Sequence, residues 1–390
     1  MKKITYFLSH PIQYFSPLLK ELAKKTDLQV YYFSDVSISG KKDIGFGQNI
    51  KWDIPLLEGY NSTFIKNYSS RTSLNNKFLD VFNPGIIKLL FDKRISIIIV
   101  NGWTYSSTLL CIVFGRLFGK RVWLRAENPL NQELRKSKRV IQLKKIFLKH
   151  VLFNLFIDKC LYIGTENKKF FEFYGVADSK LLYTPYAVDN DSFSKQHTAL
   201  QKDLQTVKLN LGLPAEKRII LFSGKYIPKK RPLDLIKAFN ELNDSNCALV
   251  MVGEGQLRPE MEQYIKEKKI ANVYLTGFIN QSDISKYYAV ADVFVMCSGM
   301  GETWGLSVNE AMNFRKPVIV SETCGSSYDL VEQGMNGFTY KEGDIDQLAE
   351  HLRKLLTDDV LRIAAGNRSY EIIQKFSIPV IVNNIVAASN

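Results

Sequence analysis

Short runs of β-branched and aromatic residues recur along this 390-residue chain, and helical patterns separate many of them. The runs lie at 3–8, 28–33, 95–100, 121–126 and 159–164 and, after a gap, at 219–224, 248–253, 272–277, 292–297 and 317–321. Several are apolar without alternation, which is typical of strands buried on both faces of a parallel sheet. Because strands and helices alternate in two separate series, the sequence predicts an α/β fold with two domains and mainly parallel sheets.

The boundary between the two series falls near 190–215. This stretch is polar, has weak periodicity and ends in Gly-Leu-Pro, which is typical of a linker. A chain of this length also exceeds what one hydrophobic core normally serves. We expect an N-terminal Rossmann-like domain over 1–195 and a C-terminal one over 205–371. A last helix over about 372–390 is expected to pack back on the first domain.

The bulk composition is that of a water-soluble protein, with 46% hydrophobic and 23% charged residues. No apolar run reaches the roughly 18 residues of a spanning helix, and the first residues lack a signal-peptide cleavage site. We therefore expect a cytoplasmic protein. The five cysteines and four histidines are scattered without metal-binding spacing, so neither a metal nor a cofactor is expected.

Positive charge is concentrated in residues 134–157, which hold seven Lys or Arg and no acid in a chain of formal net charge +13. Val140, Leu143 and Phe147 fall roughly on one helical side. This pattern fits an amphipathic helix that touches an anionic membrane, and a solvated basic face explains it equally well. No nucleic-acid-binding motif is present, so we expect no nucleic acid partner.

The stretch "GETWGLSVNEAM" (301–312) follows an apolar run and predicts a helix that starts near Gly305. The first N–H groups of a helix are free and attract phosphates. Glu302 then projects from the loop and Glu310 lies about one turn inside the helix, so both can face one ligand. Carboxylates accept hydrogen bonds from the hydroxyl pairs of sugars and riboses. The alternative is that Glu302 offsets the helix dipole and Glu310 meets a surface lysine.

A second strand end carries "FSGKYIPKKRP" (222–232), in which Lys225 follows Gly224 and Lys230 comes five residues later. Two cations at a strand end suit a diphosphate, because they donate charge-assisted hydrogen bonds to its oxygens. Taken alone, this segment is more typical of a solvated basic loop.

Taken together, the segments 221–239, 249–265, 272–321 and 334–352 resemble, in this order, the retaining glycosyltransferases of the GT-B fold in the large family four. In that family a Glu–seven–Glu motif binds the sugar nucleotide, and a Gly-Arg/Lys-x4-Lys segment neutralises its diphosphate. The resemblance covers roughly 215–360 well and the N-terminal half only in outline. It implies two Rossmann-like domains that face a cleft between them.

Carried onto this sequence, the resemblance implies that Glu310 holds the nucleoside ribose and that Glu302 touches hydroxyls of the donor sugar. Lys225 and Lys230 would stabilise the leaving diphosphate beside Gly224. Further donor contacts are implied, mostly through the backbone, at Gly277, Phe278, Thr303, Trp304, Gly305 and Leu306. The donor would be a UDP- or GDP-sugar, transferred with retention and without an essential metal. We expect a glycan or lipid-linked glycan acceptor in bacterial surface polysaccharide synthesis, such as capsule, O-antigen or lipopolysaccharide.

The N-terminal half departs from the family pattern in two loops. The loop after the first strand commonly holds glycines in the family, whereas here His10 and Gln13 are the residues expected near the donor phosphates. After the strand at 121–126 the family often has a histidine, and here Arg125 and Glu127 occupy that region. We expect Glu127 to hydrogen-bond the donor or acceptor, and an internal Arg125–Glu127 pair is the alternative.

The acceptor pocket is expected to include Trp103 and Tyr105, which follow the strand at 95–100, together with Arg125. Among other functions, a GT-B epimerase that acts on a sugar nucleotide and a non-catalytic sugar-nucleotide-binding protein stay open. A dehydrogenase is disfavoured, because no GxGxxG follows a strand with an acid about twenty residues later. A glycosidase would not need the two lysines. The donor, the acceptor, the linkage and the oligomeric state stay open.

Overall fold

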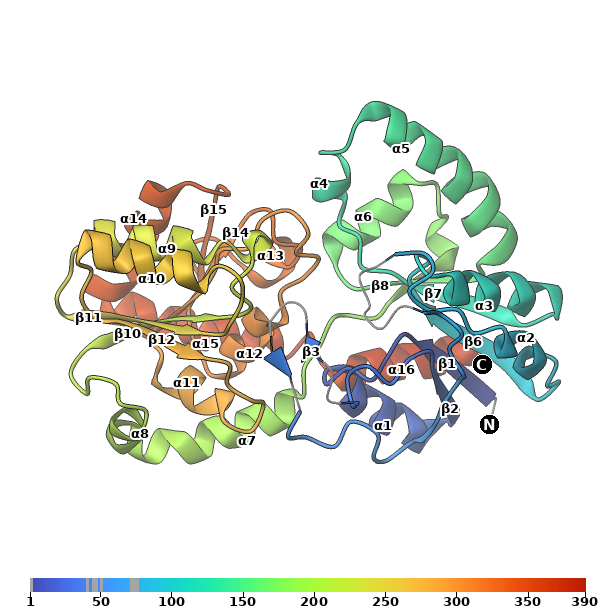
Figure 1. Cartoon of the computed structure of the whole chain (residues 1–390), viewed down its shortest axis with the longest axis horizontal. Coiled ribbons are helices and arrows are strands. Elements are labelled where there is room, and N and C mark those ends of the chain that lie inside the picture. The colour runs from blue at the N-terminus through green and yellow to red at the C-terminus, as the bar shows by residue number, and fades with distance from the viewer. Residues whose placement is uncertain (1–2, 40–41, 44–47, 50–51, 71–76) are drawn as a thin grey trace. The chain divides into compact units, whose positions relative to one another are not determined.

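The computed structural model describes the chain except residues 1–2, 40–41, 44–47, 50–51 and 71–76 (Figure 1). The chain forms two compact units. The N-terminal unit comprises residues 1–42, 49–186 and 378–390, and the C-terminal unit comprises residues 43–48 and 187–377.

The N-terminal unit contains a seven-stranded sheet in the order β5-β2-β1-β6-β7-β8-β9, in which all neighbours are parallel. Its strands are β1 (Lys3–Leu8), β2 (Asp27–Tyr32), β5 (Asn61–Phe64), β6 (Ile95–Asn101), β7 (Arg121–Arg125), β8 (Lys159–Tyr162) and β9 (Leu181–Tyr183). The central strands are buried along nearly their whole length, because helices cover both faces of the sheet. A separate short pair joins β3 (Lys42–Asp43) and β4 (Gln48–Asn49).

The helices of this unit are α1 (Phe15–Lys25), α2 (Gly85–Leu90), α3 (Ser106–Leu117), α4 (Leu130–Glu133), α5 (Lys138–Lys145), η1 (Ile146–Phe156), α6 (Thr165–Phe173), η2 (Asp178–Lys180) and α16 (Ile378–Ser389). The last of them, α16, is the C-terminal end of the chain and packs against α1 and β9 (Figure 1). One hydrogen bond fixes α16 on β9: Asn384 Nδ2 donates to the backbone carbonyl of Tyr183 at 2.9 Å. The N-terminal unit is therefore built from both ends of the chain.

The C-terminal unit contains a six-stranded parallel sheet in the order β12-β11-β10-β13-β14-β15. Its strands are β10 (Arg218–Ser223), β11 (Cys247–Val252), β12 (Val273–Gly277), β13 (Val293–Met296), β14 (Val318–Ser321) and β15 (Gly337–Tyr340). Its helices are α7 (Asn190–Leu200), η3 (Gln201–Asp203), α8 (Leu204–Asn210), η4 (Pro228–Lys230), α9 (Pro232–Leu242), α10 (Arg258–Lys268), α11 (Ile284–Val290), α12 (Leu306–Asn313), α13 (Ser327–Leu330), α14 (Ile345–Thr357) and α15 (Asp359–Ile373).

Each sheet has one point at which the strand order reverses. In the N-terminal unit the reversal falls between β1 and β6, and in the C-terminal unit it falls between β10 and β13. The loops that leave two such neighbouring strands run to opposite sides, which opens a crevice at the carboxyl ends of the strands. This topology places together the loops at 9–14 and 102–105 in one unit, and the loops at 224–231 and 297–305 in the other.

The prediction of a linker at 190–215 is wrong, because residues 190–210 form helices. The side chain of Asp189 accepts a hydrogen bond from the Ser192 N–H and thereby caps α7. The buried side-chain amide of Asn190 donates to the carbonyls of Ile373 and Phe376 at 3.2 and 3.1 Å. These polar anchors hold the helix in place, so the apolar periodicity that marks most packed helices is weak here.

One helical stretch, Asp359–Ser389, is long and apolar enough by composition to cross a membrane. The structure divides it into α15 and α16, which are separated by residues 374–377. Helix α15 packs against α12, and α16 packs against α1. Because both apolar faces are used in packing, we interpret the two as core helices of their units.

Candidate functional site

Lys230 and Glu302 form an ion pair at the strand-order reversal of the C-terminal unit. Their side chains are 15% and 10% exposed. Lys230 follows β10 and Glu302 follows β13, so each loop supplies one charge. Two further hydrogen bonds join the loops. The Gly299 N–H donates to the Lys229 carbonyl at 2.8 Å, and the side-chain Nζ of Lys229 donates to the Gly301 carbonyl at 3.3 Å. The structure therefore brings two sequence-predicted residues into direct contact.

The charge state of Glu302 results from two opposing effects. Burial alone would raise the pKa of Glu302, but the ammonium groups of Lys230 and Lys229 more than offset this, so the pKa lies below its ordinary value. Glu302 is thus a carboxylate at neutral pH. In this state it accepts hydrogen bonds and has no proton to donate.

Glu310 lies on α12 and is only 3% exposed. Its Oε2 accepts a 2.6 Å hydrogen bond from the hydroxyl of Tyr288 on α11, and its Oε1 accepts one from Gln281 Nε2 at 3.4 Å. Burial excludes the alternative in which Glu310 lies on the helix surface. The sequence pattern located Glu310, but it contained no signal for Tyr288, which resembles any other aromatic residue of a buried helix.

The indole of Trp304 anchors the start of α12. The indole Nε1 donates to Asn309 Oδ1 at 2.9 Å, and the backbone carbonyl of Trp304 accepts from the Cys324 thiol at 2.8 Å. Gly305 then adopts a φ of 93°, which favours glycine, and the helix begins at Leu306 as predicted. No side-chain hydrogen bond caps this helix, which begins directly after the loop that carries Glu302 and Thr303.

The other predicted donor residues lie at carboxyl ends of the same sheet. Gly224 follows β10, and its missing side chain leaves space beside Lys230, whose Cδ lies 3.8 Å from where a Cβ would stand. Lys225 is half-buried in the same loop. Gly277 ends β12 with a φ of 79°, its carbonyl accepts from the Gly253 N–H at 2.9 Å, and half-buried Phe278 follows it.

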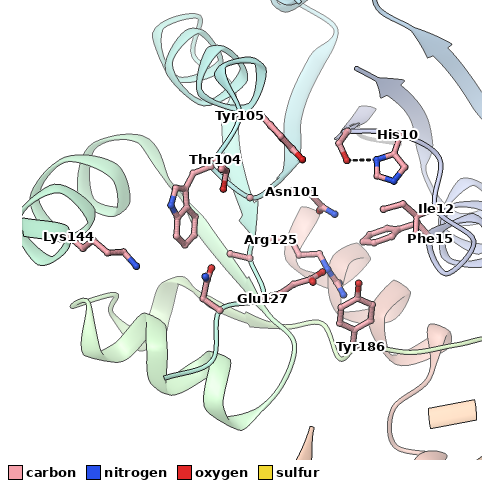
Figure 2. A pocket seen from close by; sticks show the side chains of 15 residues that line it. His10, Ile12, Phe15, Asn101, Thr104, Tyr105, Arg125, Glu127, Lys144 and Tyr186 are labelled. Carbon is pink, nitrogen blue, oxygen red and sulfur yellow. Dashed lines mark hydrogen bonds between the residues drawn. The ribbon is translucent and has the colours of Figure 1, made fainter. Parts of the chain in front are cut away.

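A pocket of about 590 Å³ opens at the strand-order reversal of the N-terminal unit (Figure 2). Its walls come from the loop after β1, the loop after β6, the end of β7, helix α5 and the segment after β9. The lining residues are Ser9, His10, Ile12, Phe15, Asn101, Gly102, Trp103, Thr104, Tyr105, Arg125, Ala126, Glu127, Asn128, Lys144 and Tyr186. The predicted residues His10, Trp103, Tyr105, Arg125 and Glu127 are therefore brought together, while Gln13 lies in the same loop as His10 but outside the lining.

Arg125 is 2% exposed and lies between two aromatic rings of the pocket (Figure 2). Its guanidinium carbon is 5.3 Å from the ring centroid of Phe15 and 5.0 Å from that of Tyr186. Its Nη1 points to the Thr184 carbonyl at 3.4 Å. Burial, and secondly the negative charge of Glu127, raise the pKa of Tyr186, whose phenol is thus neutral.

Tyr186 and Lys144 are among the pocket residues that sequence reasoning missed. Tyr186 follows β9, a strand that the sequence pattern did not reveal, so no local signal indicated Tyr186. Lys144 comes from α5, and its Nζ donates to the buried carboxylate of Glu133 at 2.5 Å. Trp103, which was predicted, stacks on Phe170 with ring centroids 6.1 Å apart. The result is an aromatic wall with a few polar groups, which suits a ring that carries hydroxyls.

Among the residues that the structure describes, no group of three or more His, Cys, Asp or Glu side chains is arranged to hold a metal ion. The cysteines are all buried and unpaired with one another. In the C-terminal unit, the lysines after β10 lie at the strand end where the sequence predicted a diphosphate site.

The chain matches the family model described as glycosyl transferases group 1 over residues 205–372. It is 29% identical over 193 residues to the sulfoquinovosyl transferase SQD2 of Arabidopsis thaliana, covering 48% of this chain and 36% of that protein. It is 28% identical over 183 residues to the alpha-monoglucosyldiacylglycerol synthase of Acholeplasma laidlawii, covering 45% of this chain and 44% of that protein. The chain thus spans less than half the length of these relatives.

A solved structure extends the likeness to the whole chain. The crystal structure of Anabaena HepE in complex with UDP and glucose matches with a TM-score of 0.75 and 17% identity, covering 100% of this chain and 99% of HepE. At this identity the likeness concerns the fold. Together with the two parallel sheets, it confirms the predicted α/β class with two Rossmann-like units of GT-B type. The cleft between the units stays a prediction.

Proposed function

Residues 205–372 of this chain belong to glycosyl transferases group 1, and on that premise we propose that the protein moves a sugar from a nucleotide-sugar donor to a glycan or lipid-linked glycan acceptor. The observation that carries the proposal is the contact between Lys230 and Glu302 at the strand-order reversal of the family-matched unit. Ligands of open α/β sheets bind at such points. One cation for a diphosphate and one carboxylate for sugar hydroxyls therefore lie side by side where a donor would bind.

In the proposed donor complex, Lys230 turns from Glu302 to the diphosphate, and Lys225 adds a second positive charge. Glu302 then accepts hydrogen bonds from donor-sugar hydroxyls. Glu310 accepts them from the ribose, held in place by Tyr288 and Gln281. The backbone from Thr303 to Leu306 lies against the sugar and diphosphate, and Gly277 and Phe278 lie against the base.

We propose that transfer occurs with retention of configuration and without a metal. The glycosidic bond to the diphosphate breaks as the acceptor hydroxyl bonds to the anomeric carbon, and the leaving diphosphate takes up the hydroxyl proton. The two lysines and the free N–H groups of α12 stabilise the negative charge that develops on the leaving group. The UDP in the HepE complex supports a UDP-sugar as the first donor to test, with GDP-sugars next.

The acceptor is proposed to bind in the N-terminal unit, in the pocket that holds Arg125, Glu127, Trp103 and Tyr105. The name of the Acholeplasma relative, a glucosyldiacylglycerol synthase, supports a lipid-linked acceptor. We propose a role in bacterial surface polysaccharide synthesis, at the cytoplasmic face of the membrane. His10 and Gln13, after β1, are proposed to reach the donor phosphates.

The test has two stages. A thermal-shift panel of UDP- and GDP-sugars should raise the unfolding temperature with at least one donor, because a ligand that binds only the folded state stabilises it. Purified protein with that donor is then incubated with and without lipid-linked glycan acceptors, and the products are identified by mass spectrometry. Acceptor-dependent transfer supports the proposal. Conversion of the donor without acceptor favours an epimerase instead, and binding without any conversion favours a non-catalytic sugar-nucleotide-binding protein.

A further inference from the structure

Large apolar side chains cover the outward face of α5 and η1 in the N-terminal unit. Four of them follow one another at spacing four, and two more lie beside them. The row consists of Leu143, Phe147, Val151 and Leu155, which are 70%, 45%, 38% and 57% exposed, with Val140 and Ile146 beside it at 44% and 61%. We call these six residues the outer row. Isolated exposed apolar residues are ordinary, but a contiguous strip along one helix indicates an interaction surface.

The helix geometry explains why the strip is straight. Residues 146–156 form a π-helix, whose hydrogen bonds span five residues, so each residue turns less than in an α-helix. Side chains at spacing four then stay on one side over several turns. The opposite side holds Leu148, Leu152 and Phe153, which are buried in the core of the unit. The outer row therefore does not take part in the hydrophobic core of the unit.

The charge around the outer row is strongly one-sided. Residues 134–157 hold seven Lys or Arg and no acid. Two of the seven, Lys136 and Lys144, pair with the buried carboxylate of Glu133. Lys138, Arg139 and Lys145 are exposed on the same helix. Long basic side chains on a helix that carries an apolar strip can keep their charges at the level of lipid phosphates while the strip enters the acyl boundary.

We propose that the outer row and the exposed basic residues of α5 form a docking surface for an anionic lipid bilayer. Charge complementarity selects this occupant, because residues 134–157 carry basic groups and no acid. Six large apolar groups also fit a fluid apolar phase, which needs no matching shape. Figure 1 shows α5 along the outside of the N-terminal unit. The same helix contributes Lys144 to the pocket. Because α5 contributes to the pocket wall, docking of α5 on the bilayer would place the pocket near the membrane surface. Lipid-linked molecules are found at that surface.

The test is cosedimentation of the full chain with vesicles of phosphatidylcholine alone or with phosphatidylglycerol. We expect binding to the anionic vesicles that weakens with added salt. The variant K138Q/R139Q/K145Q should bind on the order of 100-fold more weakly, since each basic residue near an anionic surface contributes about fivefold. L143S/I146S/L155S should also lose binding. Matched exposed residues of the C-terminal unit give the controls K202Q/K266Q/K268Q and L209S/V360S/I363S, which should bind as the wild type does.

Thermal unfolding of each variant verifies that it is folded. Equal binding to both vesicle types, no binding to either at low salt, or equal loss in the control variants would overturn the proposal. The last two results would favour an acidic protein partner or a merely solvated surface. Because vesicle binding is measured without donor or acceptor, its outcome is independent of the proposed transfer reaction.

Discussion

The ammonium group of Lys230 pairs with the carboxylate of Glu302, although the two residues belong to loops that follow different strands. The pair joins the group proposed to meet the donor diphosphate with the group proposed to meet the donor sugar. Each neutralises the other in this structure, and in the proposed donor complex each would take a new partner. Removal of Lys230 and removal of Glu302 should therefore have different effects on donor binding and on sugar transfer.

Lys230→Gln should weaken donor binding by roughly 10- to 100-fold, because a hydrogen bond to a charged group contributes about 1.5–3 kcal/mol. Glu302→Gln should instead bind nucleoside diphosphate at least as tightly as the wild type, since a negative charge beside the phosphates is removed. Its sugar transfer should nevertheless fall. Isothermal titration with UDP and turnover assays separate the two effects, with Lys268→Gln as an exposed control. Parallel losses of UDP affinity in both variants would contradict separate roles.

The stability of Lys230→Gln should depend on pH. In the wild type the pKa of Glu302 lies below its ordinary value, so the carboxylate adds stability above about pH 5 that is lost as the pH falls through the lowered pKa. Without Lys230, burial acts with less opposition and the pKa should rise. The variant should therefore be most destabilised at neutral pH, and the difference from wild type should shrink toward pH 4. Urea unfolding across this range measures it; a pH-independent difference would argue against a buried charge.

Tyr288→Phe should weaken donor binding and lower stability. The variant removes the 2.6 Å hydrogen bond to Glu310 and leaves a buried carboxylate with one fewer donor, at a cost of about 1–3 kcal/mol. Tyr287→Phe, in the preceding position of α11, is the matched control. Unfolding by urea and UDP titration are the measurements. If Tyr288→Phe binds UDP as tightly as Tyr287→Phe does, Glu310 is not positioned by this hydrogen bond.

Glu127→Gln should reduce turnover at least tenfold while the protein stays folded, because the carboxylate lines the pocket beside Arg125 and Tyr186. If Glu127 serves the acceptor, the Michaelis constant for the acceptor should rise and that for the donor should not. Glu172→Gln, an exposed change on α6, is the control. Near-normal turnover with intact folding would remove Glu127 from the site.

Several elements of the fold were predictable because their signals are local. Apolar runs without alternation indicated β1, β6, β10 and β11, which lie inside the sheets and are covered on both faces. The short strands β5, β9 and β15 were missed, and all three are edge strands with only three or four residues. An edge strand of this length is too short to form a distinct apolar run.

The sequence by itself determined the α/β class and which loops carry charged residues at strand ends, because burial imposes a short-range pattern on the residues of each element. It also located Glu302, Glu310 and the lysines after β10. Only the tertiary structure decided that Lys230 contacts Glu302, since that contact depends on β13 lying next to β10. The same holds for the pocket, in which Tyr186 and Lys144 join Arg125 from distant segments. Strand order is a property of the whole sheet, and no local pattern encodes which strand ends become neighbours.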